Sequence, residues 1–207
     1  MFSGQTLLRK EIINKINEID NENINILEIG GNDKNKNLFK NAKYYSLGYE
    51  ADINIDLNAD FTNKFDIQFD YIIISTTMMY MNNVNNFLLN SLSYMTKNSK
   101  IIIMEAFIYP QTNHKNIYDT NRLTYEFVIN FLTSKNYQII KAKRIGGIFS
   151  SILLLFIDLF PSIIKKIIGG GLIQIGKYFD LYSSKSSYFK KRHDKYYQGY
   201  IIEATKK

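Results

Sequence analysis

The chain has 207 residues, which is long enough for one well-buried domain and too short for two of ordinary size, so a single domain over residues 1–207 is expected. A hydrophobic fraction of 45% with 22% charged residues is typical of a soluble globular protein. The absence of cysteine excludes disulfides and a thiol nucleophile, and the only two histidines, His114 and His193, do not have the spacing of zinc ligands, so no metal site is predicted.

The net charge of +7 comes from a particular kind of basic residue, because 22 of the 26 basic residues are Lys and only four are Arg. Arg is the better bidentate phosphate ligand, so this usage does not favour a nucleic-acid partner. The first sixteen residues lack the apolar core and cleavage site of a signal peptide, which predicts a cytoplasmic location.

Short apolar runs alternate with amphipathic stretches along the chain, a pattern typical of a parallel sheet covered by helices. The first third predicts a helix and a buried strand, then a short helix with Asn32 or Asp33 as its N-cap. Three more strands follow, the last of them the continuous apolar run YIIIS of a central parallel strand. These elements are expected over residues 6–20, 24–29, 34–40, 43–47, 52–55 and 71–75.

The rest of the chain continues the alternation. An amphipathic helix, a central strand and a polar loop are expected over residues 82–96, 100–104 and 106–121. Thr124 is a suitable N-cap for a helix to about residue 134, and Glu126 in its first turn complements the helix dipole. Strands over 138–144 and 200–205 complete a set of seven, with a helical insertion between them.

The insertion, about residues 146–181, contains two strongly apolar pieces, IFSSILLLFIDLF and IIKKIIGGGLIQI. Neither piece has the roughly 20 apolar residues that a membrane-spanning helix needs, and joining them would bury three charged side chains. Two interpretations remain open. The pieces are helices packed on the sheet or at a homodimer interface, or residues 146–176 form an interfacial element that approaches a membrane or a lipid-linked substrate.

The first predicted strand ends in the most informative motif of the chain, Ile-Leu-Glu28-Ile-Gly30-Gly31-Asn32-Asp. A strand that ends in small residues and opens a helix lets the backbone approach a ligand closely. The motif resembles the first motif of class I S-adenosylmethionine-dependent methyltransferases. The resemblance implies a Rossmann-like α/β fold with a mostly parallel seven-stranded sheet and helices on both faces. It also implies S-adenosylmethionine as cofactor, with Gly30, Gly31 and Asn32 around its methionine portion and Glu28 fixing either the loop or the cofactor's amino group.

Later segments follow the order of that family. The strand over 43–47 is similar to the one after which an acid binds the ribose hydroxyls; here Gly48 holds that position and Glu50 is the nearest acid. The loss of a hydrogen bond to a charged group costs about 1.5–3 kcal/mol unless Glu50 replaces it. Asp60 and Phe61 resemble the segment that contacts adenine, and the strand ending at Ser75 matches the family's FD-plus-apolar-strand motif.

A further resemblance concerns the acceptor. The segment with Tyr109, His114, Asp119 and Arg122 is similar to the "YP…H…DYxRxT" segment of small methyltransferases, whose genes often lie among those for surface-glycan or secondary-metabolite synthesis. It implies a small-molecule or glycan hydroxyl as acceptor. His114 is the candidate general base and Tyr109, with Tyr80, a candidate pocket residue. Asp119 and Arg122 either form an ion pair that fixes the loop or bind substrate.

The departures from the family pattern leave two function hypotheses. In the first, the chain is an active methyltransferase. In the second, it keeps the fold without the catalysis and acts as a binding or assembly partner. Cofactor binding discriminates between them. His193, within the basic run of residues 190–193, is interpreted as a solvated surface residue.

Overall fold

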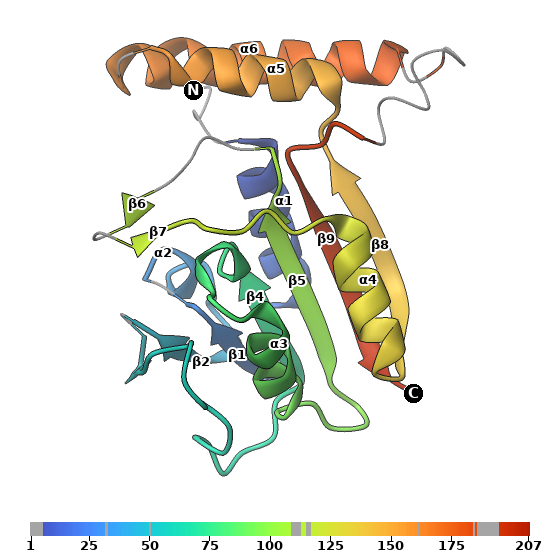
Figure 1. Cartoon of the computed structure of the whole chain (residues 1–207). Helices are drawn as coiled ribbons and strands as arrows, with labels where there is room; N and C mark the ends of the chain where they lie inside the picture. Colours follow the sequence, from blue (N-terminus) through green and yellow to red (C-terminus); the bar gives the residue numbers. More distant parts are fainter. Residues whose placement is uncertain are drawn as a thin grey trace.

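A computed structural model describes residues 6–31, 33–49, 51–108, 113–114, 117–160, 162–183, 185 and 195–207. Its centre is a seven-stranded sheet with the strand order β3-β2-β1-β4-β5-β9-β8 (Figure 1). The strands are β1 (Asn25–Ile29), β2 (Lys43–Gly48), β3 (Ile53–Asn54), β4 (Tyr71–Ser75), β5 (Lys100–Ala106), β8 (Tyr137–Ile145) and β9 (Gly199–Lys206).

Six of these strands run in one direction. The neighbours from β3 to β5 pair in parallel, whereas β9 pairs antiparallel with both β5 and β8. The prediction of a mostly parallel seven-stranded sheet is therefore confirmed. Because β9 runs against its neighbours, its first residue, Gly199, lies beside Ala106 at the carboxyl end of β5.

The helices are α1 (Leu7–Ile19), α2 (Asp33–Lys36), η1 (Met78–Tyr80), α3 (Val84–Leu92), α4 (Tyr125–Ser134), α5 (Ile148–Asp158) and α6 (Ser162–Ser183). Thr124 caps α4 as predicted, since its hydroxyl accepts a hydrogen bond from the backbone N–H of Phe127. Two helices are shorter than predicted: α2 has one turn, and α3 ends at Leu92. The polar loop over 106–121 contains a short hairpin of β6 (Asn113–His114) and β7 (Ile117–Tyr118).

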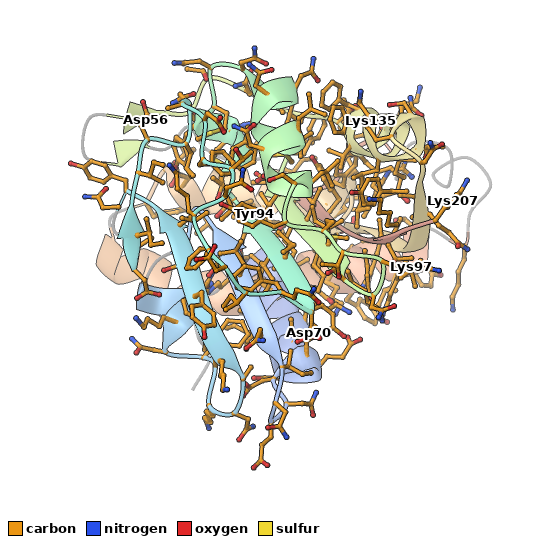
Figure 2. The ribbon with its side chains drawn as sticks, turned by 90° about the horizontal axis from the view of Figure 1, so that it is seen from below. Asp56, Asp70, Tyr94, Lys97, Lys135 and Lys207 are labelled. Carbon is orange, nitrogen blue, oxygen red and sulfur yellow. The ribbon has the colours of Figure 1, made fainter. Side chains whose placement is uncertain are left out.

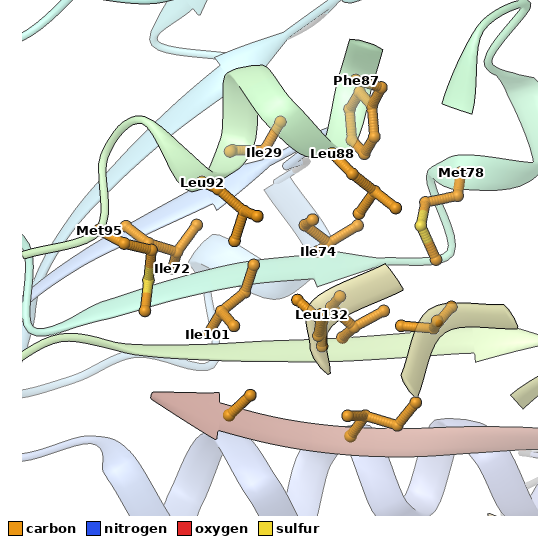
Figure 3. Packing of buried hydrophobic residues seen from close by; sticks show 14 of the residues in the cluster. Ile29, Ile72, Ile74, Met78, Phe87, Leu88, Leu92, Met95, Ile101 and Leu132 are labelled. Atoms are coloured by element: carbon orange, nitrogen blue, oxygen red, sulfur yellow. The ribbon is translucent and has the colours of Figure 1, made fainter. Parts of the chain in front are cut away.

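Side chains of the central strands alternate between two hydrophobic clusters, one on each face of the sheet. Ile72, Ile74 and Ile101 lie in the cluster that α3 and α4 cover, where they meet Leu88 and Leu132 (Figure 3). Residues between them in the strands, such as those at 73 and 102, lie in the cluster that α1 covers. Burial on both faces explains why these strands read as continuous apolar runs.

One charged side chain is buried under α1. Lys15 follows the same helical spacing as the apolar residues Ile12, Ile16 and Ile19, and it is 6% exposed. Its ammonium lies 2.7 Å from Glu203 Oε2 on β9 and pairs also with a second acid on its own helix. The pair lies between a helix and a strand at opposite ends of the chain.

The insertion forms a helical hairpin of α5 and α6, which lies across the carboxyl end of β5 at one end of the molecule (Figure 1). The helices approach closely at small residues, because a Cβ added to Gly176 would lie 2.7 Å from Ser150 Cα. Asp180 of α6 accepts hydrogen bonds from Phe149 and Ser150 N–H in the first turn of α5. None of the helices in the described residues is both long enough and apolar enough to cross a membrane.

Candidate functional site

Several of the predicted cofactor residues lie at the carboxyl edge of the parallel strands. From β1 the chain passes to β2 on one side of it, and it returns at β4 on the other side. Such a reversal of strand order is where open α/β sheets bind ligands. Gly30, Gly48 and Ser75 lie at the carboxyl ends of β1, β2 and β4. Figure 2 looks at the opposite end, where Asp70 and Lys97 precede β4 and β5.

Gly30 is held between two neighbouring strands. Its φ is +79°, a conformation that L side chains rarely adopt, and its N–H donates to Leu47 O at 2.7 Å. A Cβ at this position would lie 2.1 Å from Thr77 Oγ1, because the loop after β4 packs directly on the turn. Thr77 Oγ1 also donates to Ile29 O at 3.3 Å. Both the backbone conformation and the close approach therefore require glycine.

Glu28, two residues before Gly30, fixes this turn through buried hydrogen bonds. It is 1% exposed, and its carboxylate oxygens accept hydrogen bonds of 2.6 Å from Asn35 Nδ2 and from the Tyr44 hydroxyl. Burial raises the pKa of Glu28, against the lowering effect of these hydrogen bonds. The same Tyr44 hydroxyl lies 2.6 Å from where a Cβ of Gly31 would be. Of the two predicted roles of Glu28, these contacts provide the first, fixing the loop, since they tie α2 to β2.

Gly48 differs from its predicted place. The sequence pattern ends the second strand at residue 47, but in the structure Gly48 pairs with Asn54 as the last residue of β2. Its φ is +146°, and an added Cβ would lie 3.2 Å from Gly30 Cα. Gly48 thus allows the two glycine backbones to approach, and the position after the strand moves toward Glu50. Glu50 itself, like Asn32, is outside the described residues.

Asp60 and Phe61 point to different environments. The Asp60 side chain is exposed, and its Oδ1 accepts hydrogen bonds of 2.9 Å from both N–H and hydroxyl of Thr62, which lower its pKa. Phe61 is fully buried against Phe87, with ring centroids 5.7 Å apart. The Phe61 ring therefore belongs to the core, and the prediction that Phe61 binds the cofactor stays a prediction. Ser75, at the end of β4, is 4% exposed.

The loop after β4 is held by an acid that the sequence analysis missed. Glu105 at the end of β5 is 2% exposed, and its Oε1 accepts hydrogen bonds from the N–H groups of Thr77 at 2.7 Å and Met78 at 2.9 Å. Burial raises its pKa to about 7, although these hydrogen bonds and the charge of Arg122 act to lower it. Whereas β5 extends to Ala106, the predicted strand ends at residue 104 and the predicted loop begins at 106, so Glu105 is assigned to neither. Its position directly after an apolar run was the available signal.

Asp119 and Arg122 form an ion pair, with Asp119 8% exposed. Thr120, between them, donates its N–H to Met79 O at 2.8 Å, which joins this segment to η1. The geometry thus supplies the ion pair of the first predicted role, fixing the loop. Tyr80, the last residue of η1, is half-buried. The segment carrying the predicted acceptor residues is in this way attached to the loop that packs on the glycine turn.

The remaining predicted acceptor residues are His114, whose backbone alone is described, and Tyr109. The backbone of His114 belongs to β6, where it pairs with Ile117, and the β6–β7 hairpin lies at the level of the carboxyl end of β5 (Figure 1). Tyr109 lies outside the described residues, as does His193. Within the described part of the chain, no group of three or more His, Asp or Glu residues is arranged to hold a metal ion.

A buried polar atom lies near Glu105. Tyr200 pairs with Glu105 across β5 and β9 and is fully buried, with its ring near that of Tyr125. Its hydroxyl has no hydrogen-bond partner among the described residues. An unsatisfied buried hydroxyl costs free energy, so the Tyr200 hydroxyl lowers the stability of the packing beside the site.

No family model matches the sequence, and no curated protein matches it. The structure, in contrast, resembles many solved ones. Coclaurine N-methyltransferase, bound to N-methylheliamine and S-adenosylhomocysteine, is 10% identical, with 95% of this chain and 71% of that chain covered and a TM-score of 0.55. The [4+2]-cyclase SpnF is 10% identical, with 95% and 80% covered and a TM-score of 0.58. An O-methyltransferase from a polyketide multienzyme of Brevibacillus brevis, in complex with S-adenosylhomocysteine, is 13% identical, with 98% and 72% covered and a TM-score of 0.51.

The chain therefore has the Rossmann-like fold of class I S-adenosylmethionine-dependent methyltransferases, as the sequence motifs predict. Identities of 10–13% establish the fold and not the reaction. That one of these structures is named a cyclase makes the same point.

Proposed function

We propose that the protein is an S-adenosylmethionine-dependent methyltransferase that acts on a hydroxyl of a small molecule or glycan. The observation that carries the proposal is the glycine turn at the switch point of the sheet. There Gly30, at φ +79°, is fixed on one side by β2 and on the other by Thr77. A turn of this kind offers backbone groups to a ligand at the edge where α/β proteins bind them.

The residues at this edge fit an adenosyl amino acid. Asp60 presents an exposed carboxylate suited to the exocyclic amino group of adenine. Glu50 follows the end of β2 by two residues and is the candidate acid for the ribose hydroxyls. Two of the similar structures contain S-adenosylhomocysteine, the product of such a cofactor. When bound, the cofactor supplies a methyl group activated by a sulfonium.

The protein's own contribution is position and proton removal. Methyl transfer needs nucleophile and methyl carbon aligned at about 3–3.5 Å, so a rigid site matters more than strong chemistry from side chains. Glu28 immobilises the glycine turn, and Glu105 immobilises the loop that bears Tyr80. His114 is our candidate for the base that accepts the proton of the acceptor hydroxyl, because an unperturbed imidazole titrates near neutral pH.

Calorimetric titration with S-adenosylhomocysteine tests the cofactor part of the proposal. We expect micromolar binding, weakened about ten- to a hundredfold by Glu50→Ala through loss of a charged hydrogen-bond partner. The matched control is Glu22→Ala, an exposed acid in the turn before β1, at the other end of that strand. It should bind as the unaltered chain does.

The outcomes separate the hypotheses. No heat at millimolar ligand would refute the proposal and favour the alternative, a degenerate methyltransferase fold that serves as a binding or assembly partner. Equal affinities of the Glu50→Ala variant and the unaltered chain would remove Glu50 from the ribose site only. The acceptor class is tested separately, by incubation with labelled S-adenosylmethionine and panels of glycans and of small hydroxylated metabolites, with label in an amine-only panel as the contrary result.

A further inference from the structure

The α5–α6 hairpin carries an unusual number of exposed apolar side chains. On each helix, four large ones follow the i, i+3, i+4, i+7 spacing of a single stripe. Their exposed fractions range from 44% at Leu155 to 80% at Leu159. We call these eight the outer hairpin face: Ile152, Leu155 and Phe156 of α5 with Leu159 at its C-cap, and Ile175, Tyr178, Phe179 and Tyr182 of α6.

These eight side chains are exposed although each helix of the hairpin also has a buried face. The buried face of α5 includes Ser150 and Ser151, and its close approach to α6 is at Gly176. Small residues allow the two helices to approach, and the large apolar side chains Leu154, Ile157 and Ile173 are buried, whereas the eight of the outer hairpin face stay exposed. An exposed apolar patch of this size on a globular protein marks an interaction surface.

Charge is concentrated in the same part of the chain. Residues 146–198 contain eight Lys and Arg against three Asp, which gives a net +5 of the chain's +7. One of the acids, Asp180, is turned inward to the first turn of α5. Lys177, Lys185 and Lys195 are exposed. The segment of the sequence that carries the apolar stripes is therefore strongly basic, and three of its lysines are exposed in the described part of the chain.

We propose that the outer hairpin face docks on the surface of an anionic lipid bilayer. Amphipathic helices bind there by burying an apolar face at the boundary of headgroups and acyl chains while lysines contact anionic headgroups. Four of the eight side chains are aromatic, and Tyr178 and Tyr182 add phenolic hydroxyls that suit an interface. A second copy of the chain fits less well, because the segment that carries this face has a net charge of +5 in each copy and like charges repel.

This surface extends the predicted interfacial element. Membrane contact is predicted from the sequence over residues 146–176, but three of the four side chains that α6 contributes to the outer hairpin face lie beyond residue 176. The hairpin lies across the carboxyl end of β5, so docking would hold that edge of the sheet near the bilayer (Figure 1). The proposal does not depend on methyl transfer, since lipid binding alone tests it.

Vesicle flotation of the full chain tests the apolar part. We expect binding to vesicles of phosphatidylcholine with one third phosphatidylglycerol, and weaker binding to phosphatidylcholine alone. Leu155→Gln/Leu159→Gln should lower partitioning into the anionic vesicles by about tenfold or more, because two side chains no longer enter the boundary region. The control Ile67→Gln/Ile140→Gln changes two exposed isoleucines outside the hairpin and should bind as the unaltered chain does.

A second pair of variants tests the charge. Each lysine near an anionic surface is worth about a fivefold change in partitioning, so Lys177→Gln/Lys185→Gln should weaken binding to anionic vesicles about thirtyfold. The control Lys97→Gln/Lys135→Gln removes the same charge; both of these lysines are exposed, and they are labelled in the view from below (Figure 2). It should leave binding within a fewfold of the unaltered chain. Equal losses from both lysine pairs would show nonspecific attraction by net charge and overturn docking through the hairpin.

Two other results would also overturn the proposal. One is absence of flotation with anionic vesicles by a chain whose circular dichroism shows it folded. The other is a homodimer in sedimentation velocity that Leu155→Gln/Leu159→Gln dissociates, with no vesicle binding, which would assign the outer hairpin face to a second copy.

Discussion

Replacing Glu105 by Gln separates the charge of this side chain from its hydrogen bonds. Gln keeps a side-chain oxygen that can accept from the N–H groups of Thr77 and Met78, and it adds no volume. What it removes is a carboxylate that is 2% exposed and whose pKa burial raises to about 7 from 4.5. The variant should therefore fold, and its stability should differ from that of the unaltered chain in a pH-dependent way.

The sign follows from the direction of the pKa. Glu105 holds its proton more tightly in the folded than in the unfolded chain, so its contribution to stability is complete below pH 4.5 and is lost as pH rises through 7. The difference between about 7 and 4.5 corresponds to about 3 kcal/mol. Relative to the unaltered chain, Glu105→Gln should thus gain up to about 3 kcal/mol between pH 4.5 and pH 8.

Urea unfolding at steps of pH measures this difference directly, because all other titrating groups are common to both chains. Glu22→Gln, an exposed acid in a turn, serves as control and should run parallel to the unaltered chain. Parallel curves for Glu105→Gln would contradict the reasoning, since they would mean that Glu105 titrates alike in both states. A loss of stability that grows as pH rises would show instead that the charged form is needed to hold the loop.

Four further outcomes are expected. Gly30→Ala should cost at least about 2 kcal/mol in urea unfolding and weaken S-adenosylhomocysteine binding, since a side chain at φ +79° is strained and meets the neighbouring loop; unchanged stability would contradict this. Lys15→Met should cost up to about 3 kcal/mol, because it removes the partner at 2.7 Å from buried Glu203 and leaves only Lys100, at 3.4 Å; adding Glu203→Leu should restore much of the loss, and a cost unaltered by the second change would argue against pairing. Tyr200→Phe should be neutral or stabilise by up to about 2 kcal/mol, because the buried hydroxyl has no partner among the described residues; clear destabilisation in thermal unfolding would reveal one. His114→Gln should leave cofactor affinity unchanged in calorimetry and lower the methyl-transfer rate about 10²- to 10⁴-fold, and a normal rate would exclude His114 as base.

The parts of the fold that the sequence predicts best are those decided by near neighbours. The strand over residues 71–75 has both its limits as predicted, because an uninterrupted run of apolar residues can only be satisfied by burial on both faces. The cap at Thr124 is also local, as it depends on a hydroxyl reaching an N–H three residues later. Such features need no knowledge of which strands are adjacent.

The parts that sequence reasoning missed depend on adjacency. The partners of Glu105 lie 27 and 28 residues away, and Lys15 is separated from Glu203 by 188. Nothing in the local pattern tells that these groups meet. The position of Gly48 shows how sensitive a site is to small errors. Pairing with β3 adds one residue, Gly48, to the end of β2. This changes which residue follows the strand, and therefore which residue is expected to be the acid that binds the ribose hydroxyls.

Two buried acids hold the glycine turn, and their placement is itself an argument about the site. Glu28 binds Asn35 and Tyr44 on one side of the turn, and Glu105 fixes the loop whose Thr77 packs on Gly30. For both carboxyls, burial raises the pKa, so each charge is costly where it stands. Apolar residues at these positions would fill the same space at lower cost but could not accept hydrogen bonds from the turn and loop. The chain thus gives up stability to immobilise backbone at the edge where the methyl transfer that we propose would require alignment over fractions of an ångström.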